Sequence, residues 1–136
     1  NPSVMPAEIK KLIDNAPENL HFPGYISSDE LRIAYSGSDL YVFLTHEETE
    51  GIVLLEALAT KADILIRDIE IFEKDYVDEK NIYKGKDLKD FREKITGILS
   101  GALPSLAENA YEIAKAKSIE NTGRKLVDSY EKVLKL

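Results

Sequence analysis

The stretch LYVFLTHEETEGIVLLEALATKADILIR, residues 40–67, decides the fold of this chain. Its two continuous apolar runs, Leu40 to Leu44 and Ala62 to Arg67, are typical of strands that are covered on both faces. Between them lie a polar loop, Thr45 to Gly51, and an apolar segment of helix formers, Ile52 to Ala59, which predicts a helix buried on every side. Strand, helix and strand in this order predict parallel pairing with a right-handed crossover.

The flanking segments extend this unit in both directions. A capping box at Ser27 and Glu30 marks the start of one helix, and the segment 68–77 predicts one weak helical turn. The expected helices are Pro6 to Asp14, Ser28 to Tyr35, one that begins at Leu88, Leu106 to Ala116 and Ile119 to about Leu134, and the further strands are Leu20 to Phe22 and Asn81 to Tyr83. The predicted fold class is α/β, a Rossmann-like parallel sheet flanked by helices, with a helical C-terminal tail.

Composition limits the function classes. The chain has 136 residues, of which 43% are hydrophobic, so we expect one domain with a real core. It carries 18 Lys and Arg against 25 Asp and Glu, a net charge of −7, which argues against nucleic-acid partners. The absence of Cys excludes disulfides and thiolate metal sites. Two His residues without ligand-spaced partners predict no zinc site.

The start of the chain predicts a piece of a longer protein, and the absence of Cys is compatible with a reducing cytosol. The opening segment has early charges and no apolar core, so it predicts no signal peptide. The first residue is Asn and not an initiator Met, from which we expect a piece of a longer protein. We expect a cytoplasmic location, with any peripheral membrane contact at the cytoplasmic face made by an upstream half.

Glu56 is the most informative residue, because it is the one charged group in IVLLEALA. A carboxylate that is buried or half-buried there needs hydrogen-bond donors or a changed pKa. The alternative is a Glu at the helix margin that reaches solvent or pairs with Lys61 or Arg67. Ligands of doubly wound sheets bind outside the carboxyl ends of the strands, where the loop ending at Gly51 enters the helix.

The start of that helix is suited to a phosphate. The backbone N–H groups of Gly51, Ile52 and Val53 and the helix dipole favour an anion. The acids Glu47, Glu48 and Glu50 in the same loop would repel a phosphate unless they face hydroxyl groups or solvent. A nucleotide sugar, with a diphosphate and many hydroxyls, satisfies both conditions. At ~1.5 Å rise per residue, Glu56 lies about 7 Å along the axis from Gly51, which suits the ribose of the same nucleotide.

The spacing of these acids resembles a known family. ETEGIVLLE, residues 48–56, is similar to the motif of Glu, seven residues and Glu in retaining glycosyltransferases of the two-Rossmann GT-B architecture. Together with FPGYISSDELRIAYSGSDLYVF, RDIEIF and NIYKG, it resembles the bacterial diacylglycerol α-glucosyltransferases of glycolipid biosynthesis. The resemblance implies that residues 1–136 are most of the C-terminal, nucleotide-sugar-binding domain, and that upstream strands and the acceptor domain are absent.

The family's site residues are carried over by position. Glu56 would bind the ribose hydroxyls, Glu48 would lie beside the transferred hexose, and the backbone of Gly51, Ile52 and Val53 would contact sugar and diphosphate. Tyr25 and Ile26 match the backbone that contacts the base. The resemblance further implies retention of the anomeric configuration without an enzyme nucleophile, no essential metal and no cofactor besides the donor substrate, a UDP-sugar such as UDP-glucose.

Five positions depart from the family pattern, and two other functions stay open. Leu44 and Thr45 stand where the family commonly has Pro and Ser, and the family's basic Arg/Lys pair for the diphosphate is expected upstream of these residues. Lys61 and Glu79 stand where the family commonly has Gly, and Asp63 stands where it has Pro. The first alternative is a glycosyltransferase whose acceptor is a polysaccharide or teichoic acid, and the second is a nonenzymatic nucleotide- or protein-binding α/β module. A lipid or glycan acceptor would bind to the missing N-terminal domain, so we expect these residues alone to transfer no sugar.

Overall fold

The computed structural model describes residues 5–134 and contains a small α/β body with helical ends. The strands are β1 (Tyr41–Phe43), β2 (Ile64–Arg67) and β3 (Tyr83–Gly85). The helices are α1 (Ala7–Asp14), α2 (Ser28–Gly37), α3 (Ile52–Ala59), the short 3-10 helix η2 (Glu70–Phe72), α4 (Leu88–Leu99), α5 (Ala107–Ala116) and α6 (Ile119–Leu134). The expected order of strands and helices is confirmed from residue 28 onward.

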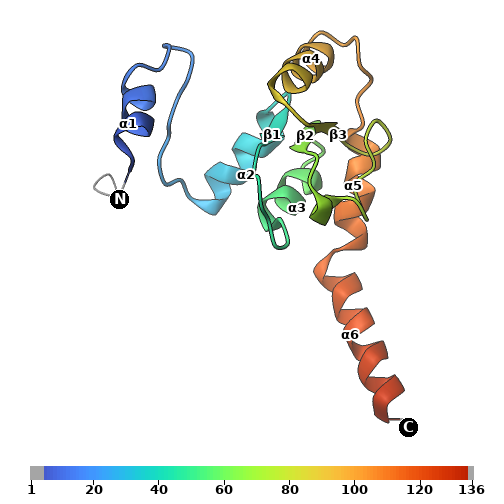
Figure 1. Ribbon diagram of the computed structural model, residues 1–136. Helices are drawn as coiled ribbons and strands as arrows, with labels where there is room; N and C mark the ends of the chain where they lie inside the picture. The colour runs from blue at the N-terminus through green and yellow to red at the C-terminus, as the bar shows by residue number, and fades with distance from the viewer. Residues whose placement is uncertain (1–4, 135–136) are drawn as a thin grey trace.

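The sheet that the described residues form is parallel, with the order β1-β2-β3. Val42 pairs with Leu65, and Leu65 pairs with Tyr83. Helices α2, α3 and α5 lie over one face of the sheet, and α4 covers the other (Figure 1). All three strands therefore point their carboxyl ends to one edge, where the loop before α3 begins.

Two strand predictions were wrong in position. Residues 20–22, predicted as a strand, form no strand and have no strand partner among residues 5–134. The last strand begins at Tyr83 rather than at Asn81, because Ile82 forms only an isolated bridge to Asp78. The described sheet consequently has three strands where four were expected.

The core has two parts, one on each face of the sheet. Leu54, Leu58, Ile66, Phe72 and Ile82 belong to the larger cluster under α3 and α5. On the opposite face, Leu65, Tyr83, Phe91 and Ile98 pack beneath α4. These clusters fix α3 on the sheet and so determine where its N-terminus lies.

Helix α3 is buried along one face only, contrary to the prediction that it is buried on every side. Leu54, Ala57 and Leu58 are buried. Ile52 is 62% exposed and Val53 39% exposed, and Glu56 is exposed as well. Residues 52, 53 and 56 are three and four positions apart, so they share the open face of the helix.

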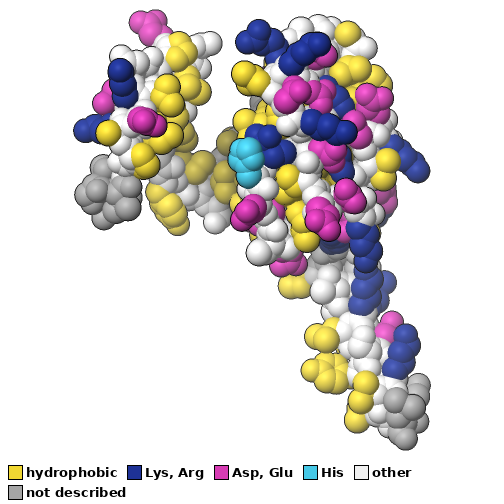
Figure 2. Space-filling view, viewed as in Figure 1, with side chains coloured by type: hydrophobic (Ala, Val, Ile, Leu, Met, Phe, Trp, Pro, Cys, Tyr) yellow, Lys and Arg dark blue, Asp and Glu magenta, His cyan; other side chains and the backbone are white. Residues whose placement is uncertain are grey.

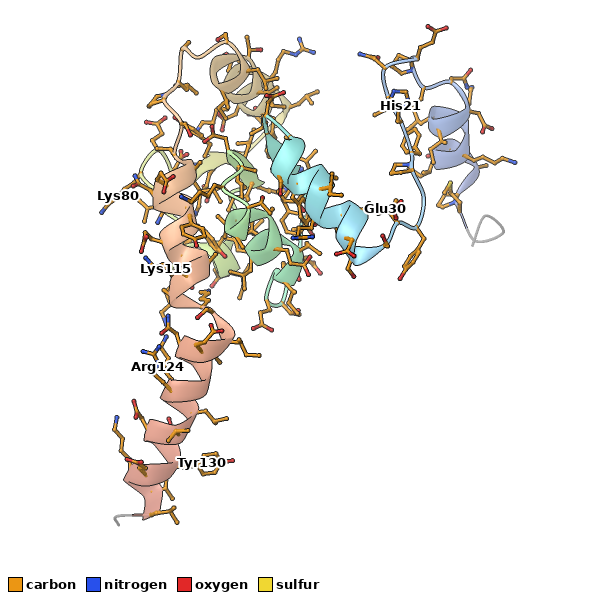
Figure 3. All side chains as sticks on the ribbon, turned by 180° about the vertical axis from the view of Figure 1, so that it is seen from behind. His21, Glu30, Lys80, Lys115, Arg124 and Tyr130 are labelled. Atoms are coloured by element: carbon orange, nitrogen blue, oxygen red, sulfur yellow. The ribbon has the colours of Figure 1, made fainter. Side chains whose placement is uncertain are left out.

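The two ends of the chain extend away from this body. Helix α1 and the segment after it lie apart from the sheet (Figure 1), and α1 buries no residue. Helix α6 projects on the other side, with apolar side chains along one flank (Figure 2). Tyr130 and Arg124 leave α6 on different sides (Figure 3). Within residues 5–134, no helix has the length and apolarity to span a bilayer.

The backbone adopts the left-handed conformation at two residues where the resembled family has Gly. Lys61 has φ 60° and Glu79 has φ 58°. Glycine reaches this region without the steric cost that a Cβ adds. The turns after α3 and before β3 thus keep a glycine-like geometry although the side chains differ, which explains how the fold tolerates these departures.

Candidate functional site

The first part of the site is the N-terminus of α3. Gly51 is its N-cap and has φ 72°, in the left-handed region that favours glycine. No side chain caps this helix end. The carbonyl of Gly51 accepts from the N–H groups of Leu54 and Leu55, at 3.0 and 3.1 Å. The first-turn N–H groups of an α-helix have no partner within the helix, so this end is a place for an anion.

Glu48 lies next to this helix end. A Cβ built on Gly51 would be 3.7 Å from the Glu48 Cγ atom and 3.4 Å from the Phe72 ring. The Glu48 carboxylate accepts a hydrogen bond of 2.9 Å from the Thr49 N–H, and its side chain is half-buried. The neighbouring acids Glu47 and Glu50 are exposed. The structure thus brings Glu48 and Gly51 together, as the spacing in the loop predicts.

Glu56 lines a cavity of about 360 Å³ between α2 and α3. The other residues around it are Ser28, Leu31, Arg32, Tyr35, Ala59 and Thr60. Of the two parts of the alternative reading, pairing with Lys61 or Arg67 is wrong, because Lys61 binds Glu108 at 2.8 Å and Arg67 donates to the Leu44 carbonyl at 3.1 Å. The other part, a Glu side chain that reaches solvent, agrees with the exposed position of Glu56. None of the ion pairs within residues 5–134 involves Glu56. The carboxylate is therefore exposed at an open cavity, not buried in the core.

Two tyrosines support the wall of this cavity. Tyr35 is 9% exposed, and its ring meets that of Tyr41 edge-on with centroids 5.2 Å apart. Burial, and then the charge of Glu56, raise the pKa of Tyr35. Burial also raises the pKa of Tyr41, with further contributions from Tyr35 and Glu56. Both phenols therefore keep their protons at neutral pH and can act as hydrogen-bond donors.

The loop of Tyr25 and Ile26 joins the same region through α2. Tyr25 is fully exposed and Ile26 is half-buried. Ser27 then caps α2, and its capping box with Glu30 is present as predicted, with a bond of 2.8 Å from the Ser27 N–H to the Glu30 carboxylate. Ser28, which follows directly, lines the Glu56 cavity. Backbone groups of this loop are thus within two residues of the cavity rim.

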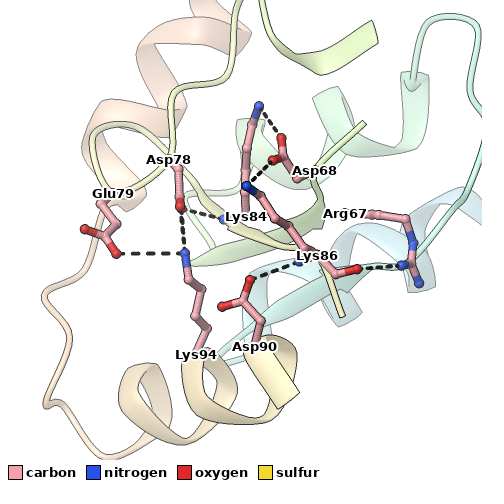
Figure 4. A network of polar contacts seen from close by, with 8 residues as sticks. All are labelled: Arg67, Asp68, Asp78, Glu79, Lys84, Lys86, Asp90 and Lys94. Atoms are coloured by element: carbon pink, nitrogen blue, oxygen red, sulfur yellow. Dashed lines mark hydrogen bonds and ion pairs between the residues drawn. The ribbon is translucent and has the colours of Figure 1, made fainter. Parts of the chain in front are cut away.

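A network of charged residues borders the sheet at the ends of β2 and β3 (Figure 4). Lys84, whose side chain is only 7% exposed, binds Asp68 at 3.2 Å, and Lys86 approaches the same carboxylate at 3.7 Å. Lys94 binds Asp78 at 2.7 Å. These contacts tie the loop after β2 to β3 and α4. A buried Lys in a short apolar run was not predicted, because its partner Asp68 is 16 positions away.

Two features of the site were missed from the sequence. Arg32 and Tyr35 line the same cavity as Glu56, and their spacing from Ser28 places all three on one face of α2. That spacing was the available signal, although the sequence pattern predicted Tyr35 only as the end of a helix. Among the described residues, no group of three or more His, Asp or Glu side chains is arranged to hold a metal ion.

Comparisons with known proteins agree with this geometry. The chain is 36% identical over 128 residues to the processive diacylglycerol alpha-glucosyltransferase of Acholeplasma laidlawii, which covers 94% of this chain and 39% of that relative. It is 29% identical over 125 residues to the alpha-galactosylglucosyldiacylglycerol synthase of Streptococcus pneumoniae, which covers 90% of this chain and 33% of that relative. The chain therefore spans about a third to two fifths of the length of these relatives.

Solved structures show the same fold. Sucrose-phosphate synthase from Thermosynechococcus elongatus superimposes with a TM-score of 0.80 at 20% identity, over 93% of this chain and 34% of that one. The C-terminal domain of a glycosyl transferase group 1 family protein from Francisella tularensis superimposes with a TM-score of 0.65 at 23% identity, over 80% of this chain and 59% of that one. The parallel sheet flanked by helices is thus that of a GT-B C-terminal domain.

The family assignment rests on most of the chain. Residues 5–117 match the family described as "Glycosyl transferases group 1", a range that includes the α3 N-terminus and the Glu56 cavity. This chain belongs to the group 1 glycosyltransferases.

Proposed function

We propose that the chain is the donor-binding C-terminal domain of a longer retaining hexosyltransferase that uses a UDP-sugar, UDP-glucose in the first instance. The observation that carries this proposal is the arrangement along α3. An uncapped helix end at Gly51 stands at the carboxyl edge of the sheet, and Glu56 faces an open cavity from the same helix. The helix end at Gly51 suits a diphosphate, and the cavity at Glu56 suits a ribose. A nucleoside diphosphate contains both groups.

The residues have distinct roles in this proposal. The N–H groups of Gly51, Ile52 and Val53 hold the diphosphate, where the helix dipole stabilises negative charge that grows as the leaving group departs. The Glu56 carboxylate accepts hydrogen bonds from the two ribose hydroxyls. Glu48, beside Gly51, contacts the transferred hexose. The backbone of Tyr25 and Ile26 contacts the base. The anomeric configuration is retained by attack on the face from which the diphosphate leaves.

The acceptor is proposed to be diacylglycerol or a related lipid. Both curated relatives carry the lipid in their names. The acceptor binds to a further domain of the longer enzyme, and that domain makes any contact with the membrane surface. In this proposal, the 136-residue chain therefore binds the donor but transfers no sugar by itself.

A donor and acceptor panel tests this proposal in the complete enzyme. UDP-glucose, UDP-galactose and GDP-mannose are offered with diacylglycerol vesicles or with a polysaccharide acceptor. We expect transfer from UDP-glucose to diacylglycerol, an α-linked product, and undiminished transfer in EDTA. A Glu48→Gln variant should lose turnover while it keeps its affinity for UDP. Transfer to the polysaccharide alone would identify the second acceptor class, and an enzyme without UDP affinity would contradict the proposal.

A further inference from the structure

We propose that Tyr35 is a positioning residue that orients the Glu56 carboxylate toward the ribose diol. This inference rests on the proposed function, in which Glu56 binds that diol. The two side chains come from different helices, Tyr35 from α2 and Glu56 from α3, and they line the same cavity of about 360 Å³. Tyr35 is the cavity residue whose hydroxyl comes from a buried ring.

The side chain of Tyr35 is held rigidly by its packing, whereas the side chain of Glu56 is free to move. The Tyr35 ring is 9% exposed, belongs to the main core cluster and packs edge-on against Tyr41. Tyr41 in turn stacks on Phe43, with centroids 6.2 Å apart. Glu56 is exposed and takes part in none of the ion pairs of residues 5–134. A free Glu side chain loses rotamer entropy when a ligand fixes it, and a hydrogen bond from a rigid donor in the same cavity would reduce that loss.

The hydrogen-bonding capacity of the two groups is compatible with this role. An ionised carboxylate has two oxygens with about four acceptor sites, and a phenol has one proton to donate. Glu56 can therefore accept from Tyr35 and from both ribose hydroxyls at once. The edge-on packing of the Tyr35 ring against Tyr41, with centroids 5.2 Å apart, fixes the orientation of the ring beside the cavity that it lines.

Arg32 lies on the same wall and is the other candidate for this role. Its guanidinium is 3.6 Å from Asp29, and both side chains of that pair are largely exposed. An exposed pair one turn apart on a helix holds its side chains weakly. The buried ring of Tyr35 is fixed more firmly, which is why the structure assigns the orientation of Glu56 to Tyr35.

A double-mutant cycle in UDP binding tests the inference. The complete enzyme is titrated with UDP by calorimetry as the parent, Tyr35→Phe, Glu56→Gln and the double variant. Tyr35→Phe keeps the ring and removes only the hydroxyl, so we expect UDP to bind about three- to tenfold more weakly, as for one hydrogen bond to a charged group that acts indirectly. In the Glu56→Gln background the same change should have almost no further effect.

The control is Tyr76→Phe. Tyr76 is also a buried core tyrosine, 3% exposed, and its hydroxyl has no hydrogen-bond partner within the described chain. It is not among the residues that line the Glu56 cavity, so its substitution should leave UDP affinity unchanged. Thermal unfolding of every variant establishes that its fold is kept, and Tyr41→Phe, with an expected smaller loss, replaces Tyr35→Phe if that variant does not fold.

The outcomes separate the inference from the function on which it rests. Unchanged UDP affinity in Tyr35→Phe, or an equal loss with and without the Glu56 carboxylate, overturns the inference and leaves the role of Glu56 intact. Unchanged UDP affinity in Glu56→Gln would contradict the contact between Glu56 and the ribose, and the inference about Tyr35 would fail with it.

Discussion

Gly51 allows a prediction in which folding and binding can be separated. Its φ of 72° lies in the left-handed region, where an L-residue costs roughly 1–2 kcal/mol relative to glycine. A Cβ would be 3.4 Å from the Phe72 ring, which is ordinary van der Waals contact, so no clash adds to this cost. We therefore expect Gly51→Ala to lower the free energy of unfolding by about 1 kcal/mol. For a domain of this size, that is a fall in Tm of roughly 4 °C.

The same substitution should weaken UDP binding. The new methyl group would stand at the helix end where the diphosphate approaches the backbone, so we expect UDP affinity to fall by about tenfold or more, equal to at least ~1.4 kcal/mol. Urea denaturation gives the loss of stability, and calorimetry with UDP gives the loss of affinity.

Gly101 provides the matched control. It has φ 74°, a Cβ built on it would meet nothing within 4 Å, and it follows α4 rather than preceding α3. Gly101→Ala should show a similar loss of stability and unchanged UDP affinity. The reasoning is refuted if Gly51→Ala binds UDP as the parent does, or if both variants lose affinity equally.

Three further predictions concern the fold. Glu79 has φ 58°, so Glu79→Gly should raise the free energy of unfolding by up to ~1 kcal/mol and give a higher urea midpoint. A lower midpoint would show that the turn is not strained. Leu54 is 0% exposed, so Leu54→Ala should lower the free energy of unfolding by about 2–5 kcal/mol. Leu88 is 78% exposed, so Leu88→Ala should change that free energy by less than ~0.5 kcal/mol in the same denaturation assay. The hydrogen bonds from Ser27 lower the pKa of Glu30 below its ordinary value of 4.5, so its stabilising effect is present above that value and is lost as pH falls through the lower pKa of the folded chain. Urea midpoints across this acid range should lose part of their pH dependence in Glu30→Gln, and an identical profile would show that the capping box does not contribute.

The central α/β unit could be predicted from the sequence because its signals are local. The bounds of α3 agree with the prediction from Ile52 to Ala59, and the capping box of Ser27 and Glu30 marks the start of α2. Continuous apolar runs identified β1 and β2. In each case the residues that form the element also carry its pattern.

The predictions that were wrong concern the contacts that an element makes with residues far from it in the sequence. The alternation in residues 20–22 is that of a strand, but a strand also needs a neighbour to pair with, and the described chain places none there. The apolar composition of α3 does not reveal that its Ile52 and Val53 face outward. Lys84 is buried in β3 and paired with Asp68, a residue 16 positions away that no local pattern around Lys84 contains.

The candidate site was predicted in part. Glu48, Gly51 and Glu56 lie on one loop and one helix, so their spacing alone places them near each other. Tyr35 and Arg32 come from α2, and only the packing of α2 against α3 brings them to the Glu56 cavity. Contacts between helices depend on tertiary packing, which sequence periodicity does not specify.

The contact between Glu56 and the ribose diol is tested most directly by comparing UDP with 2′,3′-dideoxy-UDP. Each hydrogen bond to a charged group contributes about 1.5–3 kcal/mol, so the parent enzyme should bind UDP at least ~10-fold more tightly than the dideoxy nucleotide. In Glu56→Gln, which keeps the shape of the side chain, this preference should fall close to one. An equal preference in both proteins would show that another group reads the diol, and would contradict the role assigned to Glu56.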